Sequence, residues 1–232
     1  MKRKNIFSAL VICLFSILFI FSFFTSREER AITTFSENKI KTVIIDAGHG
    51  GEDGGAVSIN GILEKDINLQ ISKKLEHLFN LFGVNTEMTR RDDSSLGENS
   101  SELIRNRKAM DIRKRVEIIN NIPDALLVSI HQNSFPQENC KGAQVFYSEK
   151  NGESKLVAEF LQEEFRSVIN NNNLRKAKTD SSIYILNNVN CPAILVECGF
   201  LTNKEEAGLL TTENYQKKIS LCLAGAIIKN LY

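Results

Sequence analysis

The stretch Val43-Ile44-Ile45-Asp46-Ala47-Gly48-His49-Gly50-Gly51 joins an apolar, β-branched run to a turn rich in glycine. The run predicts a buried strand over residues 42 to 46, because it is short, continuous and made mainly of valine and isoleucine. The glycines allow the backbone to fold back sharply, so the imidazole of His49 leaves the end of this strand. Such turns also often cradle phosphate, but the Gly-Lys-Ser/Thr sequence of those sites is absent from this chain.

Similar short runs recur along the chain and alternate with longer helical patterns. They predict strands at residues 42 to 46, 84 to 89, 125 to 130, 143 to 147, 183 to 186 and 193 to 197. Apolar residues at spacings of three and four predict an amphipathic helix from Glu64 to Phe82, with others near 109 to 119, 153 to 169 and 215 to 227. Asn203 and Glu206 have the spacing of a helix-opening capping pair. The alternation predicts a three-layer α/β/α fold around a mostly parallel, twisted sheet of about six strands.

The N-terminus differs from the rest of the chain. Lys2, Arg3 and Lys4 precede an uncharged apolar stretch from residue 6 to residue 24, which is long enough to cross a membrane. No Ala-x-Ala cleavage pattern follows it, so we favour an uncleaved signal anchor over a cleaved signal peptide in residues 1–26. The basic cluster places the N-terminus in the cytoplasm and the rest outside. Residues 27–40 then form a linker, and 41–232 form one domain.

Charge and cysteine content exclude some classes of protein. The chain has 29 basic and 28 acidic residues, which gives no sign of a nucleic-acid partner. Cys191 and Cys198 flank one predicted strand and lie too far apart along it for a disulfide. With Cys222 they are interpreted as buried thiols, whereas Cys140 lies in a polar loop and its state stays open.

Four residues stand in distinctive local contexts: His49, Glu64 in Gly61-Ile62-Leu63-Glu64-Lys65, His131 in Ser129-Ile130-His131-Gln132-Asn133, and Glu197 in Val196-Glu197-Cys198-Gly199-Phe200. Two histidines and a glutamate are a standard ligand set for a catalytic zinc, and another glutamate can deprotonate water. The third histidine, His77, is predicted to face solvent among polar neighbours. Taken alone, Glu64 fits better as an acidic residue at a helix N-terminus than as a ligand, whereas a carboxylate after the buried run 193 to 196 indicates a site.

These blocks, in this order, resemble the zinc-dependent N-acetylmuramoyl-L-alanine amidases of the Amidase_3 type, from about Lys41 to Tyr232. The resemblance implies a phosphorylase/hydrolase-like fold and a Zn²⁺ cofactor held by His49, Glu64 and His131. It implies that Glu197 is the catalytic base, and that the substrate is peptidoglycan, cut at the amide between N-acetylmuramic acid and L-alanine. Asn133 and Asp46 are predicted to make hydrogen bonds near the metal or the substrate.

The basic run from Arg105 to Glu117 is similar to that of the germination-specific subgroup, which prepares spore cortex. The resemblance implies work outside the cytoplasmic membrane, in the space between the forespore membranes. Arg115 and the rest of the Arg105 to Arg115 cluster either contact substrate or a docking partner, or form a solvated helix face. An accessory protein that completes the site also stays open.

Two other functions remain open at the level of sequence. Zinc carboxypeptidases carry a glutamate three residues after the first histidine, and Glu52 stands at that position here. A membrane-tethered, wall-binding protein without activity is the second alternative, although all four site residues are in place.

Overall fold

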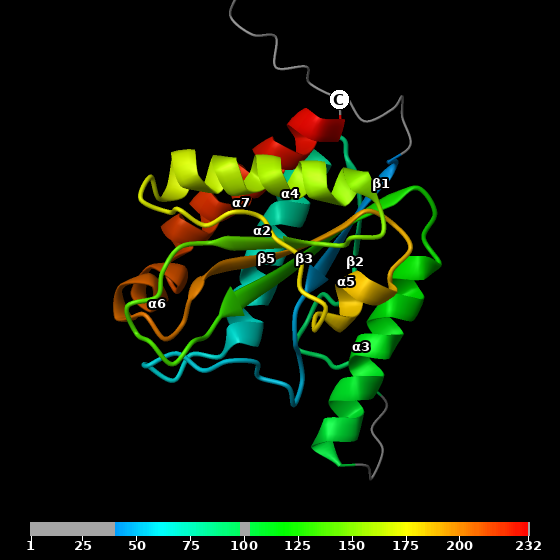
Figure 1. Cartoon of the computed structure of the whole chain (residues 1–232). Helices are drawn as coiled ribbons and strands as arrows, with labels where there is room; N and C mark the ends of the chain where they lie inside the picture. Colours follow the sequence, from blue (N-terminus) through cyan, green and yellow to red (C-terminus); the bar gives the residue numbers. More distant parts are fainter. Residues whose placement is uncertain (1–39, 98–102, 232) are drawn as a thin grey trace, which may run out of the picture. The chain divides into compact units, whose positions relative to one another are not determined.

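The computed structural model describes residues 40–97 and 103–231, and within these residues five strands form one sheet. The strands are β1 (Thr42–Ala47), β2 (Asn85–Met88), β3 (Ala125–Asn133), β4 (Gln144–Tyr147) and β5 (Ala193–Phe200). Their order across the sheet is β2-β1-β3-β5-β4, with only β4 antiparallel to its neighbour. The sheet is therefore mostly parallel, as predicted (Figure 1).

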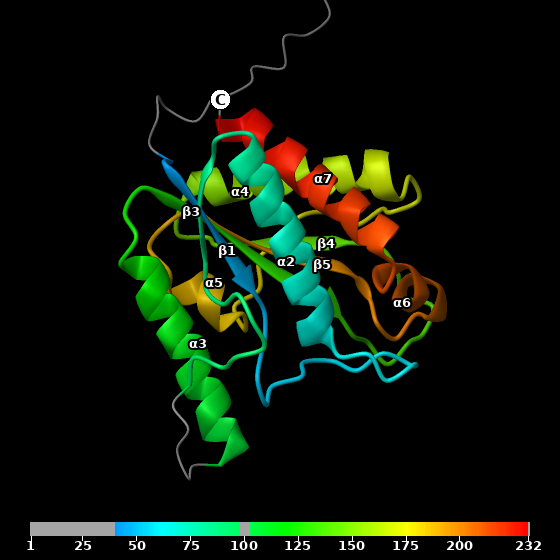
Figure 2. The ribbon, with the colours of Figure 1, turned by 180° about the vertical axis from the view of Figure 1, so that it is seen from behind.

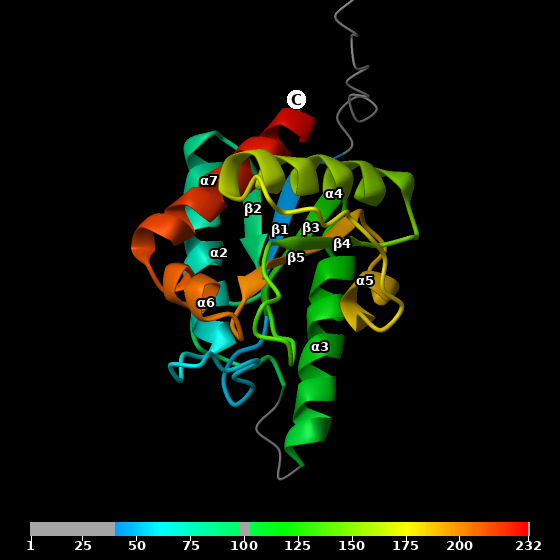
Figure 3. The same cartoon turned by 60° about the vertical axis from the view of Figure 1, so that its left-hand side comes forward.

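Helices cover both faces of this sheet (Figure 1, Figure 2 and Figure 3). One face carries α2 (Glu64–Leu81), α4 (Gly152–Glu164) and α7 (Glu213–Leu231), and the other carries α3 (Ile104–Asn120) and α5 (Tyr184–Asn188). On the second face, Ile44, Leu127 and Leu195 of the three central strands pack with Ile119 and Leu186 of these helices. Burial on both faces explains why the central strands β1, β3 and β5 begin as continuous apolar runs rather than alternating ones.

The helix predicted from Glu64 to Phe82 is α2, which ends one residue earlier. Its buried stripe follows Ile67, Ile71, Leu75 and Phe79. Phe82, which the apolar spacing placed on the stripe, is exposed because it lies at the end of the helix. The stripe packs α2 against β1 and α7, which fixes where the helix begins relative to the end of β1.

The predicted strand at 183 to 186 is wrong, because this segment forms the short helix α5. Ile185 and Leu186 of this helix are both buried in the core that also contains Ile119 of α3. Ahead of the helix, Asp180 accepts hydrogen bonds from the backbone and hydroxyl of Ser182. These local bonds favour a turn and a helix, and they reduce the predicted six strands to five.

The last part of the chain behaves as its capping pair predicts. Asn203 accepts a hydrogen bond from the backbone N–H of Glu206 at 3.0 Å, and α6 (Lys204–Leu210) begins there. The Glu206 carboxylate accepts two further backbone N–H groups, from Gly142 and Phe200. The helix predicted at 153 to 169 consists of α4 and a π-helical turn, Phe165–Ile169.

Cys140, Cys191, Cys198 and Cys222 are all free thiols. Cys198 and Cys222 are buried as predicted, but Cys191 is only half-buried, because it lies in the loop before β5 rather than in the strand. The predicted membrane segment and residues 27–39 of the linker lie outside the described residues. In residues 40–97 and 103–231 we find no helix that is both long and apolar enough to cross a membrane.

Candidate active site

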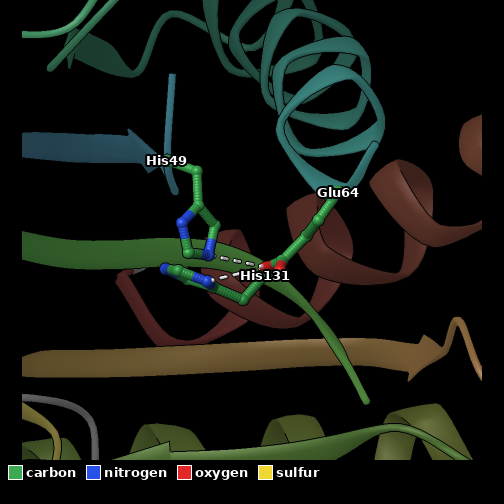
Figure 4. A group of neighbouring side chains, drawn as sticks. All are labelled: His49, Glu64 and His131. Atoms are coloured by element: carbon green, nitrogen blue, oxygen red, sulfur yellow. Dashed lines mark hydrogen bonds and ion pairs between the residues drawn. The ribbon is translucent and has the colours of Figure 1, made fainter. Parts of the chain in front are cut away.

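Three residues distant in sequence meet at the carboxyl ends of β1 and β3 (Figure 4). His49 follows β1, Glu64 is the first residue of α2, and His131 lies in β3. Their ligand atoms all lie within 4.8 Å of one another, an arrangement that could hold a metal ion. We call these three residues the metal cluster.

Both imidazoles of the metal cluster turn toward the Glu64 carboxylate (Figure 4). His49 Nε2 lies 3.2 Å and His131 Nδ1 2.9 Å from the same atom, Oε1 of Glu64. The backbone N–H of Ala56 donates to Oε2 at 2.8 Å, and that of Gln132 donates to Oε1 at 3.1 Å. Glu64 is therefore oriented from its surroundings as well as by the two histidines.

Two glycines permit this close approach. A Cβ atom on Gly48 would lie 2.3 Å from Nε2 of His131, and one on Gly55 would lie 2.5 Å from Oε2 of Glu64. His49 itself adopts a left-handed backbone conformation, with φ of 63°, which is uncommon for a residue other than glycine. The turn therefore brings the His49 ring to the metal cluster at a cost in backbone strain.

The ionisable groups of the metal cluster shift one another's pKa values. Burial lowers the pKa of His49, but hydrogen bonds to Asp53 and Glu64 outweigh burial and raise this pKa to about 9. Burial raises the pKa of Glu64, yet hydrogen bonds with His131 and His49 hold it well below its usual range. Two nitrogens and a carboxylate oxygen that face one point are the donor set of catalytic zinc sites, so these residues fit a zinc ion.

Glu197 lies beside the metal cluster in β5, directly opposite His131 in the parallel register. Both strands run three residues further than predicted, so the two residues lie inside the carboxyl-terminal parts of their strands. Oε2 of Glu197 is buried and has no hydrogen-bond partner among the described residues. Burial raises the pKa of Glu197 to about 7, against the opposing charge of His131. An unpaired carboxylate with such a pKa is suited to proton transfer near neutral pH.

A second group of polar residues lies beneath the loop that carries His49, and we call it the anchoring cluster. It comprises Asp46, Thr89, Arg90, Arg115 and Ser129, all of them buried. Asp46 accepts hydrogen bonds from Thr89 and Arg115, both at 2.7 Å, and from Ser129 at 2.6 Å. Burial raises the pKa of Asp46, but Arg115 and the two hydroxyls outweigh burial and lower it to about 2.

The two arginines of the anchoring cluster hold the backbone of the loop. Arg115 donates to the carbonyls of Ala47 at 2.8 Å and His49 at 2.6 Å. Arg90 donates to the same Ala47 carbonyl at 2.8 Å and to that of Gly48 at 3.0 Å. Asp46 and Arg115, predicted to bond near the metal or the substrate, are therefore buried supports of the loop rather than groups open to a substrate.

The other predicted residues fall in different places. Asn133 ends β3 across a β-bulge, where its carbonyl accepts the N–H of Leu201 at 2.8 Å. His77 is exposed, as predicted. In the basic run of α3, Arg107 pairs with Glu52 and Lys108 with Asp53, so this part of the helix contacts the His49 loop.

Sequence reasoning missed three residues that position the loop. Asp53 accepts a hydrogen bond from Nδ1 of His49 at 2.7 Å, and Lys65 donates to the carbonyl of Gly51 at 2.7 Å. Arg90 is the third. Only Asp53 left a trace in the sequence, as an acidic residue four positions after His49.

Two open hollows adjoin the loop segments around the metal cluster. One, of about 410 Å³, is lined by the exposed apolar side chains of Val57, Ile59 and Phe135, with Thr202 and Glu138 among the polar residues. The other, of about 320 Å³, is lined mainly by charged and small residues, including Asp53 and Lys108. The loop between His49 and α2 therefore contributes residues to one apolar hollow and to one charged hollow.

Comparison with known proteins shows what this chain resembles in sequence and in fold. Residues 43–229 match the family model for N-acetylmuramoyl-L-alanine amidase. The germination-specific N-acetylmuramoyl-L-alanine amidase of Bacillus subtilis (strain 168) is 39% identical over 189 residues, covering 82% of this chain and 79% of the relative. The CwlD amidase from Clostridioides difficile, solved in complex with the GerS lipoprotein, is 42% identical with a TM-score of 0.80. The match covers 82% of this chain and 98% of that chain. The amidase AmiC2 of Nostoc punctiforme is 30% identical with a TM-score of 0.69, covering 84% and 99%.

Proposed function

This chain belongs to the N-acetylmuramoyl-L-alanine amidase family and is an enzyme of that class, and we propose that it works with a zinc ion held by His49, Glu64 and His131. The bond cut is the amide between the lactyl group of N-acetylmuramic acid and L-alanine. The observation that carries the proposal is a three-residue metal cluster beside Glu197, which has a buried carboxylate oxygen without a partner among the described residues. The proposal therefore includes the zinc cofactor and the peptidoglycan substrate that the sequence predicts.

Each residue has a distinct part in the proposed reaction. Zinc at this site would supply Lewis acidity, which lowers the pKa of water and polarises an amide carbonyl. Glu197 takes the proton of the attacking water at its unpaired oxygen and delivers it to the leaving amine of L-alanine. Its pKa of about 7 allows both transfers near neutral pH. We also propose that Asn133, at the end of β3, makes a hydrogen bond with the substrate.

The geometry favours this metal set over that of a carboxypeptidase. Glu52, the carboxylate three residues after His49, is exposed and paired with Arg107 of α3. Glu64 supplies the carboxylate that faces both histidines. The intact metal cluster and Glu197 also argue against an inactive wall-binding protein.

The products identify the bond. The purified protein is incubated with peptidoglycan and zinc, and the soluble products are analysed by mass spectrometry. Intact stem peptides with a free L-alanine amine, and glycan that has lost them, are the expected result. Release of single amino acids would indicate a carboxypeptidase, and the absence of any product would favour a binding protein.

We further propose that the enzyme serves spore cortex. The supporting observations are the similarity to the germination-specific relative and to CwlD, and the basic run from Arg105 to Glu117. Removal of peptides exposes muramic acid that a deacetylase then converts to muramic-δ-lactam. The proposed location is outside the cytoplasmic membrane, between the forespore membranes, with residues 1–26 as an anchor or signal.

Deletion of the gene in a spore former tests this role. Growth and division are expected to stay normal, while the cortex lacks muramic-δ-lactam and spores begin germination without degrading it. Chained cells with unchanged cortex would instead point to an amidase of daughter-cell separation. A lipoprotein partner is proposed because the C. difficile amidase was solved in complex with one. Co-purification of such a lipoprotein with this protein checks that proposal.

A further inference from the structure

Two adjacent carboxylates connect the His49 loop to α3, each through its own cation. Glu52 pairs with Arg107, and Asp53 Oδ1 lies 2.6 Å from Nζ of Lys108. The two pairs have the same charges and join the same two segments of the chain. Only Asp53, however, also contacts a residue of the metal cluster.

That contact involves the ring nitrogen of His49 that faces away from the metal cluster. Oδ2 of Asp53 lies 2.7 Å from Nδ1, whereas Nε2 of the same ring faces Glu64. A neutral imidazole carries its hydrogen on one nitrogen and a lone pair on the other. A carboxylate at Nδ1 keeps the hydrogen there, so the lone pair of Nε2 points to the position where a metal would lie.

Asp53 is itself held in place by the turn that contains it. Its backbone exchanges two hydrogen bonds with Gly50, at 3.0 and 3.1 Å, and Oδ1 accepts the N–H of Gly55 at 3.2 Å. With Lys108 on the same oxygen, Oδ1 is directed toward the turn and α3, which leaves Oδ2 for the histidine. The side chain is largely shielded from solvent, whereas that of Glu52 is about half exposed.

We propose that Asp53 is a positioning residue that fixes the tautomer and orientation of His49 for zinc binding, and that Lys108 directs it from α3. The inference rests on the proposed zinc site and adds a residue that acts through a ligand. Glu52, although adjacent and equally charged, has no such role. Carboxylates that orient zinc-bound histidines typically change metal affinity by about 10- to 100-fold when mutated.

The test is the zinc affinity of the metal-free full-length protein, measured by competition with a chromogenic chelator. In Asp53→Asn the amide can present either its oxygen or its NH₂ group to Nδ1, so the tautomer is no longer fixed. We expect zinc affinity about 10- to 100-fold weaker in Asp53→Asn and in Asp53→Ala. The matched control, Glu52→Gln, should stay within about twofold of the wild type. Circular dichroism verifies that each variant is folded.

A second readout separates orientation from general charge. Nitrogen NMR of the metal-free protein at alkaline pH, where the imidazole is neutral, reports which ring nitrogen of His49 carries hydrogen, and Asp53→Asn should raise the share of the Nε2–H form. An unchanged tautomer, an unchanged zinc affinity, or an equal loss in Glu52→Gln would each overturn the role of Asp53. His131→Ala distinguishes a failure of the Asp53 proposal from a failure of the zinc site. If His131→Ala left zinc binding unaffected, the proposed function itself would be contradicted.

Discussion

The anchoring cluster and the metal cluster lie beside the same loop, and each has a carboxylate with a buried oxygen in or next to it. Asp46 of the anchoring cluster accepts hydrogen bonds from three side chains, which lower its pKa to about 2. Glu197, beside the metal cluster, has a buried oxygen without a partner among the described residues, and burial raises its pKa to about 7. The pKa of a carboxyl group is thus lowered at one place in the sheet and raised at another place nearby.

The difference separates support from chemistry. A buried carboxylate is costly unless it is paired, so a paired one serves the fold and an unpaired one is retained for another reason. Asp46 and Arg115 fix the backbone of the loop, and the loop then presents His49 to Glu64. Substitutions in the two clusters should therefore have different consequences.

The largest effect is expected in the metal cluster. Alanine in place of His49, Glu64 or His131 removes one of three protein ligands, so bound zinc and activity should both be lost. Zinc content by mass spectrometry and product release measure this, and Glu52→Ala is the control that keeps both. If Glu52→Ala lost zinc while Glu64→Ala retained it, the metal set would be that of a carboxypeptidase.

Asp46→Asn should act on the fold instead. Removal of one partner of a buried ion pair costs about 3 to 5 kcal/mol, because Arg115 would stay buried without its counter-charge. Urea denaturation of the metal-free protein measures the loss of the free energy of unfolding. Glu197→Gln should cause no comparable loss, and equal destabilisation by the two substitutions would remove the distinction between the clusters.

The pH dependence of stability sharpens the same comparison. The pKa of Asp46 falls from an ordinary value of 3.8 to about 2 on folding. The resulting stabilisation is fully present above the unfolded pKa and is lost as pH falls through about 2. It amounts to roughly 2 kcal/mol. The difference in unfolding free energy between wild type and Asp46→Asn should narrow by that amount from pH 5 to pH 2, and a constant difference would contradict the assigned pKa.

A single neutral hydrogen bond should matter least. Thr89→Val removes the hydroxyl that donates to Asp46 but leaves Arg115 and Ser129 in place. The expected loss is about 1 kcal/mol in the free energy of unfolding, with zinc content unchanged. Calorimetry of the metal-free protein measures the loss of stability. A lowered zinc content in the folded variant would show that the anchoring cluster affects the metal directly.

Local patterns in the sequence predicted the mostly parallel sheet and most helices. The run from Val43 to Ile45 is apolar throughout because its strand is buried on both faces, and α2 shows its periodicity from Ile67 to Phe79. The prediction of a strand at residues 183 to 186 was wrong, because four apolar or aromatic residues fit a strand or a helix equally well. Bonds between the Asn187 and Asn188 side chains and carbonyls of that segment favour the helix.

The metal cluster could be located from motifs, but its supports could not. Arg90 and Arg115 bind backbone carbonyls about 43 and 66 residues away in the chain, and no pattern in the sequence marks a carbonyl as a partner. The partners of Asp46 could not be predicted for the same reason, since all three come from separate parts of the chain. Only the fold shows that this carboxylate is fully paired while Glu197 is not.

Glu197→Gln tests the central claim most directly. The amide keeps the shape of the side chain and leaves the metal cluster intact, but it cannot take up the proton of water. Zinc content and the turnover of a muramoyl peptide are measured on the same preparation. The account predicts normal zinc content with turnover lowered by about 10² to 10⁴. Near wild-type turnover in the zinc-loaded variant would contradict it.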